Sequence, residues 1–228
     1  MKKTNLCSAA LIGVMGLFSN VSADELGVNF QLTGTSDYVL RGVSQTSDKA
    51  AVFGDITVSY GNFFAGIWAA NVDFRKFGVT DAHVEVDYYA GYANEFKNFE
   101  YSAAYARYTY PGSKDIDDID ELKFDLGYRY DKFKIGGKYE IGTWNENKNA
   151  KLDYVEGYAS YDFDILTLGL AAGSYEKVGD NITLALSKAG EFAGQNVEFR
   201  VKYSDFNADS KGAYEDEKNL FAEVVFTF

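Results

Sequence analysis

Apolar side chains recur at every second position along most of this sequence. In ELGVNFQLTG, residues 25–34, they stand at Leu26, Val28, Phe30 and Leu32, with small or polar residues between them. Successive side chains of a β-strand point to opposite faces, so this segment forms a strand with one apolar and one polar side. The pattern therefore predicts an all-β chain.

The same alternation returns in about twelve segments, with ten or fourteen as the alternative counts. The predicted strands lie near residues 25–36, 50–60, 63–73, 82–92, 99–110, 121–131, 132–142, 152–161, 164–175, 181–188, 197–204 and 219–228. Each is close to the ~9 to 11 residues that a tilted strand needs to cross a bilayer, and an even number of strands is typical of single-chain outer-membrane barrels. We expect a transmembrane, antiparallel, up-and-down β-barrel.

The connections between the predicted strands differ in length in a regular way. Short turns are predicted at GN, DK and DFD, and longer loops at DYVLRGVSQTSDKA, FRKFGVTDA, PGSKDIDDID, TWNENKNAK and DFNADSKGAYEDEK. Short periplasmic turns and long outer loops are typical of such barrels. EKVGD is shorter than this scheme expects, and KAGEFAGQN is longer. Aromatic residues beside the short turns predict a girdle at the inner interface.

The beginning of the chain has the form of a secretory signal peptide. MKK, the apolar run LCSAALIGVMGLF and the small residues of SNVSA predict cleavage after Ala23. Residues 24–228 would then form one barrel domain. The cysteine of the sequence, Cys7, would leave with the signal peptide, so we expect neither a disulfide nor thiolate chemistry.

The end of the chain carries a second export signal. Leu220, Ala222, Val224 and Phe226 share one face of the last predicted strand, and Phe228 is the final residue. We expect the apolar face to meet lipid and Phe228 to be the terminal aromatic that the barrel assembly machinery recognises. No stretch after residue 23 approaches the ~20 apolar residues of a spanning helix, and a closed barrel is the other way to satisfy backbone groups in lipid.

Composition excludes some classes and leaves one alternative fold. The net charge of −12 repels polyanions, so nucleic acid is not an expected partner. A soluble β-sandwich also alternates, with its apolar face turned to a core. The predicted signal peptide, the even strand number, the interfacial aromatics, the single proline and the terminal phenylalanine together favour the barrel.

Charged residues occupy the polar face of many predicted strands and should line the lumen. The acidic members are Glu85, Asp87, Glu100, Glu121, Asp125, Glu140, Glu156, Glu198 and Glu223, and the basic members are Lys123, Arg129, Lys134, Lys138, Arg200 and Lys202. They either set up a field that selects ions or small polar solutes, or form cross-strand ion pairs that fill a narrow barrel. A twelve-stranded barrel lies between the filled barrels of eight strands and the open channels of sixteen.

One candidate constriction lies beyond the first strand. Continuing its parity past residue 33 places Asp37 and Arg41 inward, and Tyr38 and Leu40 outward. Arg41, beside flexible Gly42, is predicted to reach across the pore mouth as a fixed cation near carboxylates. The alternative is an arginine that pairs within an outer loop.

A stretch of about forty residues from the first predicted strand to the third carries a family resemblance. It has the pattern S-x-Y-x-x-R-G-x-S-Q-T followed by G-x-W-x-x-N-V-D. The matching residues are Ser36, Tyr38, Arg41, Gly42, Ser44, Gln45, Thr46, Gly66, Trp68, Asn71, Val72 and Asp73. This stretch resembles the TorF-like family of outer-membrane porins of Gram-negative bacteria. The resemblance implies a porin role and names no solute.

Two other features were weighed as chemical sites. The acidic run DIDDIDE, residues 115–121, has oxygen ligands for Ca²⁺ or Mg²⁺ but lacks the glycine and spacing of an EF-hand, so a solvated loop that divalent ions bridge to lipopolysaccharide phosphates is favoured over a dedicated site. His83 is the single histidine, predicted on the inner face with Glu85 and Asp87, and no serine beside it marks a dyad. We therefore expect no catalytic residues, metal site or cofactor.

Together these features predict a monomeric porin-like channel in the outer membrane. It would let small hydrophilic solutes or ions diffuse passively, with a mild preference for cations, and would contact outer-membrane lipid and lipopolysaccharide. A non-conducting barrel acting as an adhesin or a structural protein is the alternative, followed by an outer-membrane lipid-modifying enzyme.

Overall fold

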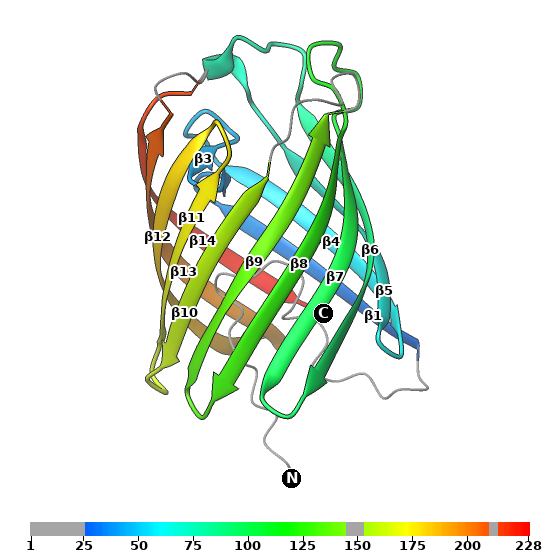
Figure 1. The fold of residues 1–228 in the computed structure, drawn as a ribbon, viewed down its shortest axis with the longest axis vertical. Helices are drawn as coiled ribbons and strands as arrows, with labels where there is room; N and C mark the ends of the chain where they lie inside the picture. The colour runs from blue at the N-terminus through cyan, green and yellow to red at the C-terminus, as the bar shows by residue number, and fades with distance from the viewer. Residues whose placement is uncertain (1–25, 145–152, 210–213) are drawn as a thin grey trace.

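The computed structural model describes residues 26–144, 153–209 and 214–228, and in it twelve strands close into an antiparallel barrel (Figure 1). The predicted signal peptide, residues 1–23 with Cys7, lies outside the described residues. The barrel strands are β1 (Leu26–Thr35), β4 (Ala51–Tyr60), β5 (Phe63–Asn71), β6 (Val84–Phe96), β7 (Phe99–Thr109), β8 (Ile119–Tyr130), β9 (Phe133–Trp144), β10 (Tyr154–Asp162), β11 (Thr167–Tyr175), β12 (Gly179–Phe192), β13 (Gln195–Ala208) and β14 (Glu217–Thr227). The prediction of twelve strands is confirmed.

Three short elements lie in the connections. Strands β2 (Val39–Leu40) and β3 (Val43–Ser44) pair with each other between β1 and β4, and a 3₁₀ turn, η2 (Arg75–Phe77), lies between β5 and β6. Among the residues described, no helix is long and apolar enough to span a membrane.

Closure of the barrel depends on the first and last strands. β1 pairs with β4 over its whole length and with β14 from Gln31, opposite Thr227, to Thr35, opposite Glu223. The backbone N–H of Phe228 continues this ladder by donating to the carbonyl of Phe30 at 2.9 Å, and the two rings lie 5.4 Å apart. Closure removes the free strand edges that would otherwise pair with another chain.

Short turns gather at one end of the barrel and most of the longer connections at the other (Figure 1). The segment KAGEFAGQN, expected to be a long connection, is mostly strand. β12 runs to Phe192 and β13 starts at Gln195, so the turn itself is only Ala193 and Gly194, both with positive φ. Two-residue turns of this kind match the twist of paired strands. This connection therefore fits the rule of short turns that it seemed to break.

The outer surface of the barrel is apolar. Leu220, Ala222, Val224 and Phe226 lie on the outside of β14, as predicted, and Leu220 is 74% exposed. Other strands present leucine, isoleucine, valine and aromatic side chains in the same way. An apolar area of this extent is not found on ordinary water-soluble monomers, and it suits contact with lipid.

Several large side chains point inward, over glycines of the neighbouring strand. Tyr89 is paired with Gly66, and Tyr158 with Gly136. A Cβ atom on Gly66 would stand 2.3 Å from the Tyr89 hydroxyl, and one on Gly136 would stand 2.4 Å from the Tyr158 hydroxyl. The glycines thus let tyrosine rings lie against the barrel wall and keep space in the lumen.

Candidate solute pathway in the lumen

The segment between β1 and β4 turns into the barrel instead of extending outward. We call residues 37–46 the inserted hairpin, because they contain the paired strands β2 and β3 and lie inside the outer half of the barrel (Figure 1). Asp37 ties its two ends together, since its Oδ1 accepts hydrogen bonds from the hydroxyls of Ser44 at 2.7 Å and Thr46 at 2.8 Å. Burial raises the pKa of Asp37, and these two hydrogen bonds oppose the rise.

Arg41 lies at the tip of the inserted hairpin and crosses to the opposite wall. Its Nη2 is 2.6 Å from Oε1 of Glu121 on β8 and 2.5 Å from Oε2 of Glu140 on β9. The guanidinium also lies 4.8 Å from the ring centres of both Tyr154 and Tyr175. The Arg41 side chain is only 8% exposed. Its guanidinium is stabilised by the two carboxylates and by the faces of the two tyrosine rings.

Gly42 lets the tip approach the wall formed by β12, β13 and β14. A Cβ atom at this position would stand 2.8 Å from the Cβ of Asn181 and 2.9 Å from that of Phe206, and the φ of Gly42 is +90°. The Gly42 carbonyl accepts a hydrogen bond from Nδ2 of Asn219 at 3.1 Å. Only glycine fits this contact without strain.

The expected outward orientation of Tyr38 and Leu40 is wrong. Both line the cavity inside the barrel, and the Tyr38 ring packs against Phe53 at 5.6 Å and Trp68 at 5.4 Å. The period of two ends with β1 at Thr35, so parity carries no information about the residues that follow.

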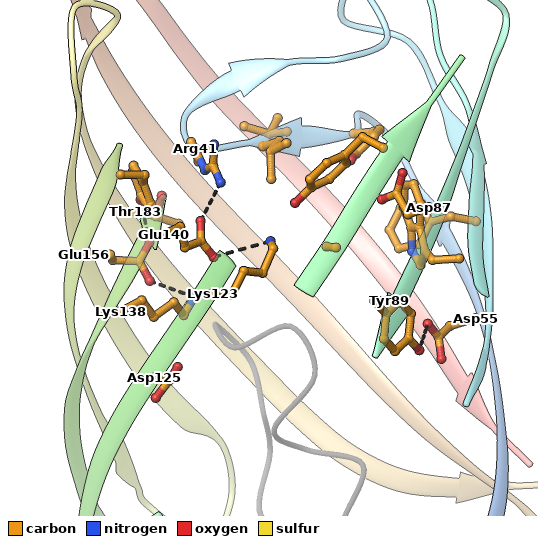
Figure 2. A pocket seen from close by; sticks show the side chains of 18 of the residues that line it. Arg41, Asp55, Asp87, Tyr89, Lys123, Asp125, Lys138, Glu140, Glu156 and Thr183 are labelled. Atoms are coloured by element: carbon orange, nitrogen blue, oxygen red, sulfur yellow. Dashed lines mark hydrogen bonds and ion pairs between the residues drawn. The ribbon is translucent and has the colours of Figure 1, made fainter. Parts of the chain in front are cut away.

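A cavity of about 440 Å³ lies below the inserted hairpin (Figure 2). The part of its wall formed by β8 to β10 differs in charge from the part formed by β4 to β6. On the wall of β8 to β10 most charges are paired: Lys138 lies 3.0 Å from Glu156, and Lys123 lies 3.4 Å from Glu140 and 3.2 Å from Glu121. Asp125 of this wall instead accepts a hydrogen bond from the Tyr158 hydroxyl at 2.8 Å. This wall combines acidic and basic groups in close contact.

The wall of β4 to β6 carries acidic groups facing the same cavity. Asp55 accepts hydrogen bonds from the hydroxyls of Tyr89 at 2.6 Å and Thr57 at 2.7 Å, and Asp87 lies nearer the outer end. None of the described residues of β4 to β6 that line the cavity is basic.

The structure brings most of the predicted lumen residues to the cavity. Those that line it are Arg41, Asp87, Lys123, Asp125, Lys138, Glu140, Glu156, Arg200, Lys202 and Glu223. On β13 and β14, Lys202 and Arg200 both bind Glu223, at 2.8 Å and 3.4 Å. The sequence left two alternatives, an open charged path or a lumen filled by cross-strand ion pairs. The structure has cross-strand ion pairs and, beside them, a cavity.

The predicted lumen residues that do not line the cavity are seven: Asp37, Glu85, Glu100, Glu121, Arg129, Lys134 and Glu198. Asp37 lies within the inserted hairpin, and Glu85 is 1% exposed. Arg129 and Lys134 both pair with Glu100, and Glu198 pairs with Arg200 at 2.7 Å. Parity identifies the inner face of a strand but not which inner positions border open space.

Sequence reasoning missed Asp55 and the inward tyrosines. Asp55 stands in AVFGDITVSY at the parity of Phe53 and Thr57, so the alternation of that segment contained the signal. Tyr89, Tyr154 and Tyr158 point inward. From the sequence, tyrosines are expected mainly on the outer face or at the membrane interface. Their glycine partners on adjacent strands become apparent only once the strand register is known.

Loop contacts cover the outer end of the barrel. Phe77 of η2 packs against Tyr214, with ring centres 5.2 Å apart, and Lys76 lies 2.6 Å from Glu217 of β14. Val43 of the inserted hairpin is buried beneath them with Phe206. The outer mouth is therefore narrowed by packed loops as well as by the inserted hairpin.

The other two predicted features lie away from the cavity. His83 precedes β6, is exposed and does not line the cavity. In the acidic run, Asp118 and Asp120 pair with Arg107 at 2.7 Å and 3.4 Å. The part of the chain that the structure describes contains no group of three histidine, cysteine, aspartate or glutamate residues that could hold a metal ion.

The closed twelve-stranded barrel, apolar outside and charged inside, is of the kind found in outer-membrane porins. The chain belongs to the family described as "Bacterial protein of unknown function (Gcw_chp)", whose model matches residues 20–225. A comparison with curated proteins found no match.

Solved structures of outer-membrane channels share the fold. The KdgM porin in complex with disordered oligogalacturonate is similar with a TM-score of 0.58 and 9% identity, over 88% of this chain and 97% of that one. The COG4313 outer-membrane channel from Pseudomonas putida F1 gives 0.53 and 9%, over 91% and 96%. The NanC porin gives 0.52 and 8%, over 89% and 99%. At these identities the similarity concerns the fold.

Proposed function

We propose that this chain is an outer-membrane channel of the TorF-like type through which small hydrophilic solutes and ions diffuse passively, with a mild preference for cations. The observation that carries the proposal is the charged cavity inside a closed barrel whose outer surface is apolar. Such a barrel stands in lipid with every strand paired and offers polar solutes a path through the bilayer.

Selection by size would occur at the inserted hairpin. Its tip is fixed to β8 and β9 through Arg41 and to β14 through Gly42, so the narrowing does not depend on a freely moving loop. Passage then requires small solutes or a displacement of the hairpin. The mechanism needs no cofactor and no coupling to an energy source, and it assigns no catalytic residue.

The cation preference is inferred from the charges that remain unbalanced. Arg41, Lys123 and Lys138 each contact a carboxylate, whereas Asp55 and Asp87 face the cavity on a wall without a basic lining residue among those described. An excess of negative charge beside a narrow aqueous path raises the local concentration of cations.

The remaining parts of the proposal concern export and surroundings. We infer cleavage of the segment 1–23, insertion by the barrel assembly machinery through Phe228, contact with outer-membrane lipid and lipopolysaccharide, and a monomeric state. The apolar outer face of β14, with Phe228 54% exposed at its end, supports the role of the last strand.

Single-channel recording tests the proposal. The protein from residue 24 onward would be refolded, inserted into a planar bilayer and recorded across a KCl gradient. Discrete current steps with a cation-leaning reversal potential are expected. A folded and inserted protein that carries no current would contradict the proposal and favour a non-conducting barrel, whereas an anion-leaning potential would contradict the cation preference alone.

A further inference from the structure

Glu85 and Asp87 are two carboxyl groups that the ion pairs of the barrel leave out. They stand two residues apart on β6 and therefore face the same side. Glu85 is 1% exposed and Asp87 9% exposed. The two side chains are hydrogen-bonded to each other, and among the described residues neither oxygen of Glu85 nor Oδ1 of Asp87 has another partner. Two buried carboxyl groups in contact are costly when both are charged, so the pair is stabilised either by a shared proton or by a cation.

The nearest basic side chain is already engaged elsewhere. Lys123 acts electrostatically on both Glu85 and Asp87, but its Nζ lies 3.2 Å from Glu121 and 3.4 Å from Glu140. No salt bridge between described residues includes Glu85 or Asp87. A cation that completed the pair in place of a proton would therefore come from outside the described residues.

Aromatic rings surround the two carboxyl groups. In the strand register Asp87 stands between Trp68 on β5 and Tyr108 on β7. Tyr38 of the inserted hairpin packs on Trp68 and lies near both carboxyl groups. Burial, followed by the charges of Glu85 and Asp87, raises the pKa of Tyr38 well above its usual value, so this hydroxyl stays neutral. Asp87, Trp68, Tyr38 and Tyr108 all line the cavity, so a solute in the lumen can reach them.

We propose that Asp87, with the buried Glu85 behind it and with Trp68, Tyr38 and Tyr108 beside it, forms a binding subsite for the ammonium group of a solute. An ammonium group donates up to three hydrogen bonds to carboxylates and is attracted to aromatic faces. An ammonium group uses both the charge of Asp87 and the aromatic faces beside it, whereas a hydrated divalent metal ion would use the carboxyl groups alone. The inference rests on the proposed function, because a subsite in the lumen acts on solutes that enter the channel.

Tryptophan fluorescence gives a binding assay that does not require current. In a Trp144→Phe background Trp68 is the remaining tryptophan of the chain. The refolded protein in detergent micelles would be titrated at pH 7 with propylammonium chloride, and in parallel with 1-propanol and with NaCl. A saturable change in Trp68 fluorescence with propylammonium alone is expected. No saturable change, or an equal response to 1-propanol or NaCl, would overturn the subsite.

Isosteric variants locate the site. The double variant Glu85→Gln/Asp87→Asn should weaken propylammonium binding about tenfold or more, because hydrogen bonds to charged groups are lost. The variant Glu95→Gln/Glu191→Gln removes two exposed carboxylates and is the matched control for net charge. Equal affinity in both double variants would refute the assignment. Binding of propylammonium without current would contradict the proposed channel and leave the subsite standing. Current without binding would support the channel and contradict the subsite.

Discussion

Arg41 is the side chain that we expect to hold the inserted hairpin in the lumen. It contacts Glu121 and Glu140 at 2.6 and 2.5 Å and lies between two tyrosine rings. Removing one partner of a buried ion pair costs about 3 to 5 kcal/mol, largely because the other charge is left unpaired. Replacing Arg41 by alanine would leave Glu121 and Glu140 with Lys123 as the one basic side chain in contact with them among the described residues, so we place the cost at the lower end of this range.

The hairpin can relieve that cost by leaving its place. Residue 41 takes no part in the pairing of the barrel strands, so water can reach Glu121 and Glu140 while the barrel stays closed. We therefore expect Arg41→Ala to favour undocking of the hairpin, by about 3 kcal/mol, rather than unfolding of the barrel. Larger current steps should accompany undocking, since the lumen is wider without the hairpin.

Thiol labelling measures the undocking. Val43 is 4% exposed in the docked hairpin, and a chain that starts at residue 24 lacks the single cysteine of the sequence, Cys7. A Val43→Cys thiol would be labelled only in the undocked state. About 3 kcal/mol corresponds to a roughly 10²-fold faster labelling with Arg41→Ala. Arg41→Lys, which keeps the charge but loses the planar guanidinium, should give an intermediate rate.

The reasoning would be refuted if Val43→Cys were labelled equally slowly with and without Arg41. Heat-modifiable mobility on a gel would show in each case that the barrel is folded. Equal labelling would mean that packing of the hairpin, rather than its ion pairs, holds it in the lumen.

Three further predictions concern the hairpin and the loops above it. Gly42→Ala should weaken docking by about 1 to 3 kcal/mol through its clash and its positive φ, measured by the same labelling, while Gly34→Ala, whose Cβ would meet nothing within 4 Å, should change nothing. Phe77→Ala removes the ring contact with Tyr214 and should raise the single-channel conductance; unchanged conductance would show that this contact does not narrow the mouth. Hydrogen bonds from Arg75 and Lys49 hold the pKa of Asp73 well below its usual value of 3.8, so these contacts should be fully present above about pH 4 and be lost only at lower pH; a carboxyl NMR titration of Asp73 with an ordinary midpoint would contradict this.

The strands could be predicted because their signal is local. In β8, apolar Leu122, Phe124 and Leu126 alternate with charged Lys123 and Asp125. This alternation matches the two sides of a barrel wall, one facing lipid and one facing the lumen, and can be recognised from the sequence alone. The end of a strand is a weaker signal. The glycines and alanines of KAGEFAGQN interrupt the apolar face, and the segment was expected to be a connection. Backbone pairing nevertheless continues through it to Phe192.

The site could be predicted only in part, because it depends on contacts between distant segments. Arg41 meets Glu121 and Glu140, which are 80 and 99 residues away along the chain, and no local pattern indicates that pairing. Tyr38 was misplaced because it lies beyond the end of β1, where the period of two no longer fixes the direction of a side chain.

The distinction between balanced and unbalanced charges also needed the structure. The sequence placed Lys123, Lys138, Glu85 and Asp87 on inner faces without separating them. The barrel register pairs the lysines with glutamates and leaves Glu85 and Asp87 together among aromatic rings.

Solute flux into liposomes tests most directly whether this barrel is a channel. Vesicles that contain the refolded protein from residue 24 onward would be mixed with an isosmotic solution of a pentose or of a trisaccharide, and swelling would be followed by light scattering. The account predicts swelling that is fast with the pentose, slow with the trisaccharide and faster for both in the Arg41→Ala variant. Swelling no faster than that of protein-free vesicles, from protein shown to be folded and inserted, would contradict it.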